Sequence, residues 1–168
     1  MGLSRPPSPA AALTVGLISD THGLLRPEAV AALRGSDYII HAGDICAPEI
    51  LSALEEIAPV TAVRGNNDHG AWAMSIQETA VLQAGATFIY VIHDLAEMDV
   101  DPRAAGFHAV ISGHSHRPLS ASRDGILFVN PGSAGPRRFS LPVSVGRLLV
   151  AGTKVEGQLI ELRMADRR

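Results

Sequence analysis

Side chains that can bind metal ions follow five apolar runs of this 168-residue sequence, each close to the point where the run ends. They are Asp20, His22, Asp44, Asn66, His93, His114 and His116. In a parallel α/β sheet the carboxyl ends of the strands lie along one edge, where ligands bind, so we expect these seven side chains to meet. Oxygen and imidazole ligands without a thiolate indicate Mn, Fe, Zn or Ni, and they argue against a structural zinc finger.

Each part of this set is a weak signal alone. An Asp-x-His such as Asp20 to His22 is common by chance, and an isolated histidine is more often a hydrogen-bonded structural residue. The pair His114 and His116 is more specific, because alternate residues of an extended segment point the same way. The ordered set therefore predicts a metal site where no single member could.

The first half of the chain alternates apolar runs with helical stretches. We expect strands at residues 13–19, 37–41 and 59–63, and helices at residues 27–33 and 48–57. Pro27 and Pro48 suit the first turn of the two helices, since a proline there loses no helical hydrogen bond. Repeated strand–helix units predict a parallel sheet.

The second half is expected to be mostly strands, with one short helix. The strands are predicted at residues 79–82, 87–92, 109–111, 126–129, 144–151 and 154–162, and the helix around residues 101–105. The pattern predicts an α/β fold in which two sheets pack face to face and helices cover the outside. We expect one domain over residues 13–168, preceded by a flexible proline-containing tail at residues 1–12.

Composition excludes several classes of protein. A hydrophobic fraction of 46% and a charged fraction of 18% are typical of a globular protein. The net charge is −3 and the basic residues are scattered, so no nucleic-acid surface is indicated. We find no apolar stretch long enough for a membrane span, and prolines near the start oppose a signal peptide. The single cysteine, Cys46, fits a reducing compartment and is expected as a small buried filler, so a cytoplasmic location is predicted.

The ordered motifs resemble the calcineurin-like metallophosphoesterase superfamily. They are Asp20-Thr-His22, Gly43-Asp44, Gly65-Asn66, His93 and Gly113-His114-Ser115-His116. The continuation Asn130-Pro-Gly-Ser133 and Pro136-Arg137 resembles its small bacterial and archaeal phosphodiesterase branch. The resemblance extends over residues 13–162 and implies a four-layer α/β/β/α sandwich with two mixed β-sheets flanked by helices.

The resemblance also implies a role for each residue of the set. Asp20, His22 and His116 would hold a first metal ion, Asn66, His93 and His114 a second, and Asp44 would bridge the two. By the same resemblance Asp44, Asn66 and His93 are the catalytic candidates, and Asn66 and Asn67 would bind substrate. Two divalent ions per chain are expected, with Mn²⁺ first and Fe, Ni or Zn as alternatives.

Elementary electrostatics agrees with these roles. Two divalent ions and two ligand aspartates leave a net positive charge, which suits a phosphoester anion. A water that bridges the ions has its pKa lowered toward about 7, and the resulting hydroxide can attack phosphorus in line. The sequence therefore predicts a phosphodiesterase that acts on a small phosphoester substrate.

Two positions depart from the family pattern. Asn67 stands where the phosphatases of the superfamily usually have a histidine that protonates the leaving group, and an amide cannot do this. His69 could substitute, although an ordinary loop histidine is the favoured interpretation. Asp94 stands where a glycine is common, as a partner of the second metal's ligands or as a loop residue.

Other candidates are expected to have structural roles. His41 should hydrogen bond behind Asp44, and His108 should support a strand. Ser133 belongs first of all to a turn. Whether Trp72 is a lid or a core residue is left open.

Two alternative functions remain at this point. The first is a non-catalytic interaction scaffold, because the resemblance includes a vacuolar-sorting subunit that uses this fold as a binding surface. The second is a nucleotide or nucleic-acid phosphohydrolase, which would share the metals and differ in its substrate pocket. A homodimer is considered as the oligomeric state.

Overall fold

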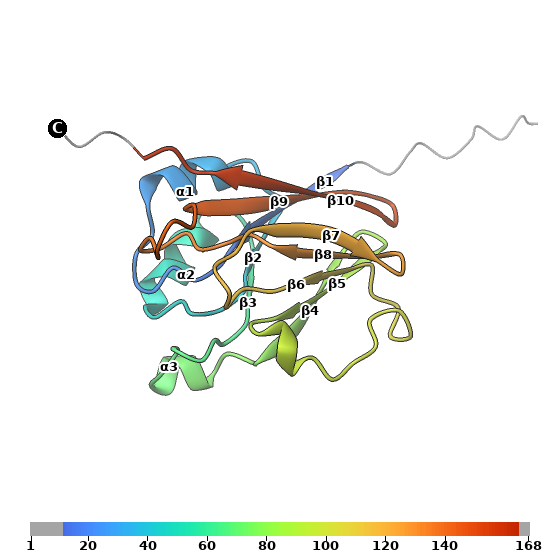
Figure 1. Ribbon diagram of the computed structural model, residues 1–168, viewed down its shortest axis with the longest axis horizontal. Helices are drawn as coiled ribbons and strands as arrows, with labels where there is room; N and C mark the ends of the chain where they lie inside the picture. The colour runs from blue at the N-terminus through green and yellow to red at the C-terminus, as the bar shows by residue number, and fades with distance from the viewer. Residues whose placement is uncertain (1–11, 165–168) are drawn as a thin grey trace, which may run out of the picture.

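Two five-stranded mixed sheets pack face to face in the computed structural model, which describes residues 12–164 (Figure 1). The first sheet runs in the order β10 (Lys154–Glu161), β9 (Ser144–Ala151), β1 (Leu13–Ile18), β2 (Tyr38–His41) and β3 (Val60–Ala62). The second runs in the order β4 (Thr79–Ala84), β5 (Thr87–Ile92), β6 (Ala109–Ile111), β8 (Ile126–Asn130) and β7 (Leu119–Arg123). The tail predicted at residues 1–12 lies outside the described residues except for its last one.

Parallel pairing brings the strand ends of each sheet to one edge. In the first sheet β1, β2 and β3 are parallel, while β9 pairs antiparallel with β1 and with β10. In the second sheet β5, β6 and β8 are parallel, and β4 and β7 are antiparallel edge strands. The loops that follow the parallel strands therefore emerge together.

The main core lies between the two sheets. Leu17 and Ile40 of the first sheet and Ile89 and Ile111 of the second are fully buried in one cluster there. The neighbouring residue Ile18 faces the other side of its sheet, as the two-residue period of a strand requires. Because β1 is buried on both faces, its sequence is a nearly continuous apolar run.

Helices cover the outer face of the first sheet (Figure 1). They are α1 (Pro27–Leu33) and α2 (Pro48–Glu55), while the short α3 (Ala71–Met74) lies apart from them beyond β3 (Figure 1). Leu33 and Leu54 are buried against this face. Trp72 of α3 is partly buried against the same cluster, which makes it a contact of the core. The layered α/β sandwich is therefore as predicted on this side.

The outer face of the second sheet has a thinner cover. A 3₁₀ turn, η1 (Leu95–Glu97), and the chain that follows it pack on Tyr90, Ile92 and Val110. The helix expected around residues 101–105 is wrong, because this segment forms turns. The Asp101 carboxylate accepts hydrogen bonds from the backbone N–H groups of Arg103 and Ala104, as at the start of a helix, but Gly106, with a φ of 84°, ends the segment before a helix is established.

Two further elements were not predicted. The strand β7 is mostly exposed, and its apolar residues, Leu119 and Ala121, are too few to indicate a strand from the sequence. The helix α3 has only four residues and is too short for a helical period. Among residues 12–164, no helix is long and apolar enough to cross a membrane.

Candidate metal centre

Backbone hydrogen bonds join the loop after β1 to the loop after β2. The N–H of Asp20 donates to the carbonyl of Gly43 at 3.0 Å, and that of His22 donates to the carbonyl of Asp44 at 2.9 Å. These bonds extend the parallel pairing of the strands beyond their ends. Asp20, His22 and Asp44 are thereby held at one place by the main chain.

The backbone itself is unusual at most of the predicted ligands. Five of the seven have positive φ angles in the left-handed region: Asp20 (54°), His22 (45°), Asp44 (55°), His114 (69°) and His116 (60°). Such a conformation is strained for a residue with a Cβ, and strain of this kind gathers at functional sites.

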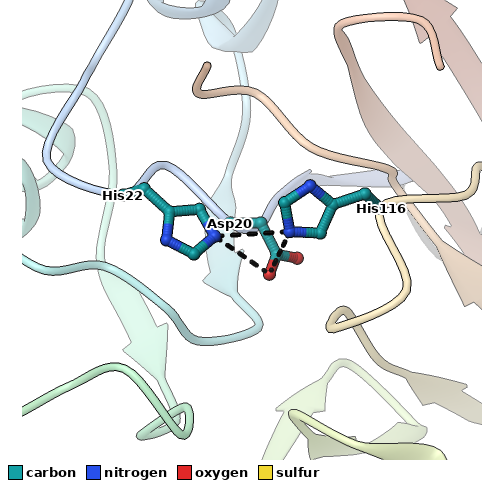
Figure 2. Close-up of side chains that lie close together, drawn as sticks. All are labelled: Asp20, His22 and His116. Atoms are coloured by element: carbon teal, nitrogen blue, oxygen red, sulfur yellow. Dashed lines mark hydrogen bonds and ion pairs between the residues drawn. The ribbon is translucent and has the colours of Figure 1, made fainter. Parts of the chain in front are cut away.

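Asp20, His22 and His116 form a first cluster (Figure 2). The Nε2 atoms of the two imidazoles are 3.3 Å apart and lie 3.7 Å (His22) and 3.3 Å (His116) from Oδ1 of Asp20. This buried oxygen accepts no well-directed hydrogen bond, whereas Oδ2 accepts from the Ser19 hydroxyl and the His114 N–H. Two atoms bound about 2.1 Å from one ion lie roughly 3.0–3.4 Å apart, so the donor set fits a single cation.

His93, Asn66 and His114 form a second cluster beside the first. The Nδ1–H of His93 donates to the carbonyl of Ala42 at 2.7 Å, which leaves Nε2 as an acceptor in the neutral ring. That Nε2 faces Oδ1 of Asn66 at 3.0 Å, and the same oxygen lies 3.1 Å from Nδ1 of His114. Acceptors that face one another in this way fit a shared cation.

Asp44 lies between the two clusters. Its Oδ2 is 3.6 Å from Nε2 of His22 and 3.4 Å from Nε2 of His93. Asn67 donates to both carboxylate oxygens, from its backbone N–H and from its side-chain amide, each at 2.9 Å. The carboxylate is thus oriented from behind and could contact two ions at once.

The protonation of these groups follows from their neighbours. Burial raises the pKa of Asp20, but the imidazoles of His116 and His22 and the Ser19 hydroxyl outweigh it, so the pKa lies well below its ordinary value. Burial also raises the pKa of Asp44, and the nearby imidazole of His93 and hydrogen bonds from Asn67 outweigh it and lower the pKa to about 2. Both carboxylates are therefore ionised at neutral pH.

His93 shows the opposite balance. Burial lowers its pKa, but Asp44, the Ala42 carbonyl and the charge of Asp20 outweigh it and raise the pKa above its ordinary value. Positive charge is thus favoured at the point where Nε2 faces Asn66 and Asp44. A bound cation would supply that charge in place of a proton.

Two glycines allow the site loops to approach one another. A Cβ at Gly65 would overlap the carboxylate of Asp44, and one at Gly113 would overlap Ser19 and the carboxylate of Asp20. Each glycine directly precedes a predicted ligand in the sequence. The Gly-Asn and Gly-His pairs of the motif therefore have a steric cause.

His41 supports the site without belonging to it, as predicted. It is fully buried, its Nδ1 accepts the N–H of Gly43 at 3.2 Å, and its Nε2 lies 3.0 Å from the Thr21 hydroxyl. That hydroxyl donates to the carbonyl of Ile45. Burial lowers the pKa of His41 to about 4, so the imidazole is neutral and links the two loops.

Sequence reasoning missed three supporting residues. Ser19 donates to Asp20, and the buried carboxylate of Asp68 accepts the N–H groups of Gly65 and Cys46. The Asn130 amide donates to the carbonyl of Gly113 and so supports the loop that carries the two later histidines. These are hydrogen-bonding roles that residue type alone does not reveal. The buried aspartate two residues after a predicted ligand was the available signal.

The expectation that Cys46 is a buried filler is wrong. Ile45 enters the core instead, and the thiol is exposed at the rim of the site, with Sγ 3.8 Å from Nδ1 of His22. Partial burial, together with the charges of Asp68 and the site aspartates, raises the pKa of Cys46 to about 11. The thiol is therefore protonated at neutral pH.

The remaining candidates fall into three groups. Asp94 lies beside the second cluster, where its Oδ2 is 3.7 Å from Nε2 of His114. His108 accepts the N–H of Phe88, and Ser133 donates to the carbonyl of Asp20, so both have structural contacts. His69 lies exposed in the loop after β3.

Comparison with known proteins agrees with this geometry. Residues 13–152 match the calcineurin-like phosphoesterase superfamily domain. A probable metallophosphoesterase of Methanothermobacter thermautotrophicus is 32% identical over 160 residues, which are 88% of this chain and 92% of the relative. A phosphodiesterase of Methanocaldococcus jannaschii is 25% identical over 139 residues, 71% of this chain and 83% of its own length. Vacuolar protein sorting 29 of Cryptosporidium parvum shares the fold, with a TM-score of 0.72, 21% identity and coverage of 91% of this chain and 99% of the other.

Proposed function

The chain belongs to the calcineurin-like phosphoesterase superfamily, and we propose that it is a dinuclear-metal-dependent phosphodiesterase acting on a small phosphoester. The observation that carries this proposal is the position of Asp44 Oδ2, within 3.6 Å of His22 and 3.4 Å of His93. A carboxylate oxygen between two ligand clusters is what two adjacent cations require. The phosphodiesterase name of the relative from Methanocaldococcus jannaschii supports the choice of substrate class.

In this proposal each cluster holds one divalent ion. The first is held by Asp20, His22 and His116, the second by Asn66, His93 and His114, and both by Asp44. Such a pair of ions polarises the phosphoryl oxygens and lowers the pKa of bound water. Mn²⁺ is proposed first, and Fe, Ni or Zn would suit the same oxygen and imidazole donors.

The protein side chains orient these groups and balance their charge. The two ionised aspartates, Asp20 and Asp44, leave a net positive charge when the site is loaded, which attracts a phosphate diester. The Ala42 carbonyl fixes the orientation of His93, whose Nε2 faces the centre. Asn66 and Asn67 are exposed at the opening, where their amides can meet a substrate.

Asn67 limits the range of leaving groups in this proposal. Its side-chain amide donates to Asp44, and an amide supplies no proton to a departing oxygen. Protonation by a positioned acid is worth about 10²–10⁴-fold for poor leaving groups. We therefore expect aryl phosphodiesters to be hydrolysed at least about 100-fold faster than alkyl esters.

The test is the activity of metal-stripped protein reloaded with Mn, Fe, Ni, Zn or Mg. Aryl phosphodiesters, aryl and alkyl monoesters and cyclic nucleotides form the substrate panel. We expect activity only after reloading, and greatest on aryl diesters. Equal rates on aryl and alkyl esters, together with a loss confined to alkyl esters in His69→Ala, would show instead that His69 supplies the proton.

An interaction scaffold of the same fold is the second candidate. The likeness to vacuolar protein sorting 29 supports it at the level of the fold. Complete ligand clusters favour the enzyme, because a binding surface has no need of buried carboxylates aimed at imidazoles. Turnover absent with every metal of the panel would favour the scaffold, and turnover confined to the cyclic nucleotides would favour a nucleotide phosphohydrolase. A homodimer and a cytoplasmic location stay predictions.

A further inference from the structure

Two cavities of different character meet at His114 and Asp94. One has a volume of about 560 Å³ and the other about 430 Å³, and both residues line each of them. His114 is an exposed member of the second ligand cluster, and its Nδ1 lies 3.1 Å from Oδ1 of Asn66. The larger cavity therefore begins at the edge of the candidate metal centre.

The larger cavity is walled mainly by apolar side chains. They come from the chain after β5, from β7, from β8 and from the loop before β9: Leu95, Pro118, Leu119, Phe128, Val129 and Leu141. Its volume lies in the range of about 300–1,000 Å³ that is typical of sites for small organic molecules. Leu119 keeps 47% of its surface exposed, so this wall offers apolar area to an incoming group.

The smaller cavity is polar and acidic. It contains Glu78, Glu97 and Asp99 beside the cluster residues Asn66 and His93. The cation that it contains, Arg64, pairs with Glu78 at 2.9 Å. An apolar substituent of a bound phosphoester would therefore be better accommodated in the larger cavity than here.

We propose that the larger cavity binds an apolar substituent, of the size of an aromatic ring, on the phosphoester whose phosphoryl group is held at the metal centre. The inference rests on the proposed function, and it adds the substrate class: phosphodiesters with one compact apolar group. His114 contributes to both places, so one ligand can reach the metal centre and the apolar wall together. Leu119, Phe128 and Leu141 then act as specificity-determining residues.

The test is direct binding rather than turnover. Phenylphosphonate and methylphosphonate carry the same anionic group, differ in the apolar substituent, and have a P–C bond that hydrolysis does not cleave. We expect calorimetric titration of the Mn²⁺-loaded full chain to give a Kd about tenfold lower for phenylphosphonate, from the apolar area it buries.

A pair of leucine variants localises the preference. Leu119→Ser should reduce the preference for phenylphosphonate by about threefold or more and leave the Kd of methylphosphonate unchanged. Leu159→Ser is the matched control, because Leu159 is a similarly exposed leucine, 40% against 47%, on the edge strand β10. This control should retain the full preference.

Each result separates this inference from the one on which it rests. Equal affinity for the two phosphonates, or the same loss in both leucine variants, would overturn the substituent site while the metal centre stands. Binding of neither phosphonate to the loaded protein would overturn the proposed function and this inference with it.

Discussion

The two ends of the sheets place different residues in the left-handed backbone region. At the end away from the metal centre, the turns β4–β5, β7–β8 and β9–β10 use Gly85, Gly125 and Gly152 at φ angles of 60°, 78° and 62°. Asp124 (φ 51°) also occurs there, and aspartate is among the residues that tolerate this region. In the loops at the carboxyl ends of the parallel strands, here called the metal end, five predicted ligands occupy the same region, together with Cys46 and with glycines such as Gly23 and Gly43.

The difference agrees with a metal-binding role for the loops at the metal end. Glycine adopts positive φ without strain, whereas a residue with a Cβ is destabilised there by roughly 1–2 kcal/mol. A ligand must carry a side chain, so glycine cannot serve at those positions. Hydrogen bonds between the loops hold the strained backbone, as the contacts of His41 with Thr21 and of Asp68 with Cys46 illustrate.

The largest expected effect is a loss of activity on substitution at the carboxyl end of β2, with no such loss at its other end. Asp44→Asn at the carboxyl end removes the carboxylate between the clusters. We expect kcat/KM on an aryl phosphodiester to fall about 1,000-fold or more, since loss of residues that only orient a ligand already costs 10- to 100-fold. Circular dichroism should stay that of the unmodified protein.

Asp37→Asn is the control for this variant. Asp37 precedes the same strand, is exposed and accepts the N–H of Thr14, so it resembles Asp44 in type and differs in place. Its activity should remain within about twofold, as for surface substitutions away from a site. Similar losses in both variants would contradict the assignment of Asp44.

The second prediction concerns the hydrogen bonds that hold the metal-end loops. The pKa of His41 falls from 6.5 to about 4 on folding. Its neutral ring therefore stabilises the fold above pH 6.5, and this contribution, about 2–3 kcal/mol, is lost as the pH falls from 6.5 towards 4.

His41→Gln isolates this contribution because glutamine does not titrate. In metal-free protein, the free energy of unfolding of the unmodified chain should exceed that of the variant at pH 7.5, and the gap should narrow by about 2 kcal/mol at pH 4.5. Urea titration at both pH values measures the gap. A gap independent of pH would mean that His41 does not hold the loops as a neutral donor.

The smallest effects should have opposite signs at the two ends. Cys46 has a φ of 65° at the metal end and is no predicted ligand, so Cys46→Gly should relieve strain and raise the free energy of unfolding by about 1 kcal/mol. Cys46→Ala keeps the strain and should not. Gly85→Ala introduces strain at the other end and should lower the same quantity by about 1 kcal/mol. If Cys46→Gly and Gly85→Ala changed the free energy of unfolding in the same direction, the proposed difference in backbone strain between the two ends would be wrong.

The seven residues that the sequence predicts as ligands lie close together in the structure, and this was predictable because the ends of strands can be recognised from apolar runs. The apolar runs before Asp20, Asp44 and His93 end where the buried strands end. Parallel pairing of the strands then brings the residues that follow them to one edge of each sheet. Sequence reasoning missed β7, whose residues are mostly exposed, and it expected a helix at residues 101–105 where the segment forms turns. Backbone φ angles depend on contacts between loops, so no local pattern indicates them. The bonds of Ser19 to Asp20 and of Gly65 to Asp68 are local, but residue type alone does not reveal them.

The central claim is that the two clusters hold two ions with Asp44 between them. Elemental analysis of the full chain, stripped, reloaded with saturating Mn²⁺ and freed of excess metal, measures this directly. We expect two ions per chain in the unmodified protein and in Asp37→Asn, and fewer in Asp44→Asn. At most one ion per chain in the unmodified protein would contradict it.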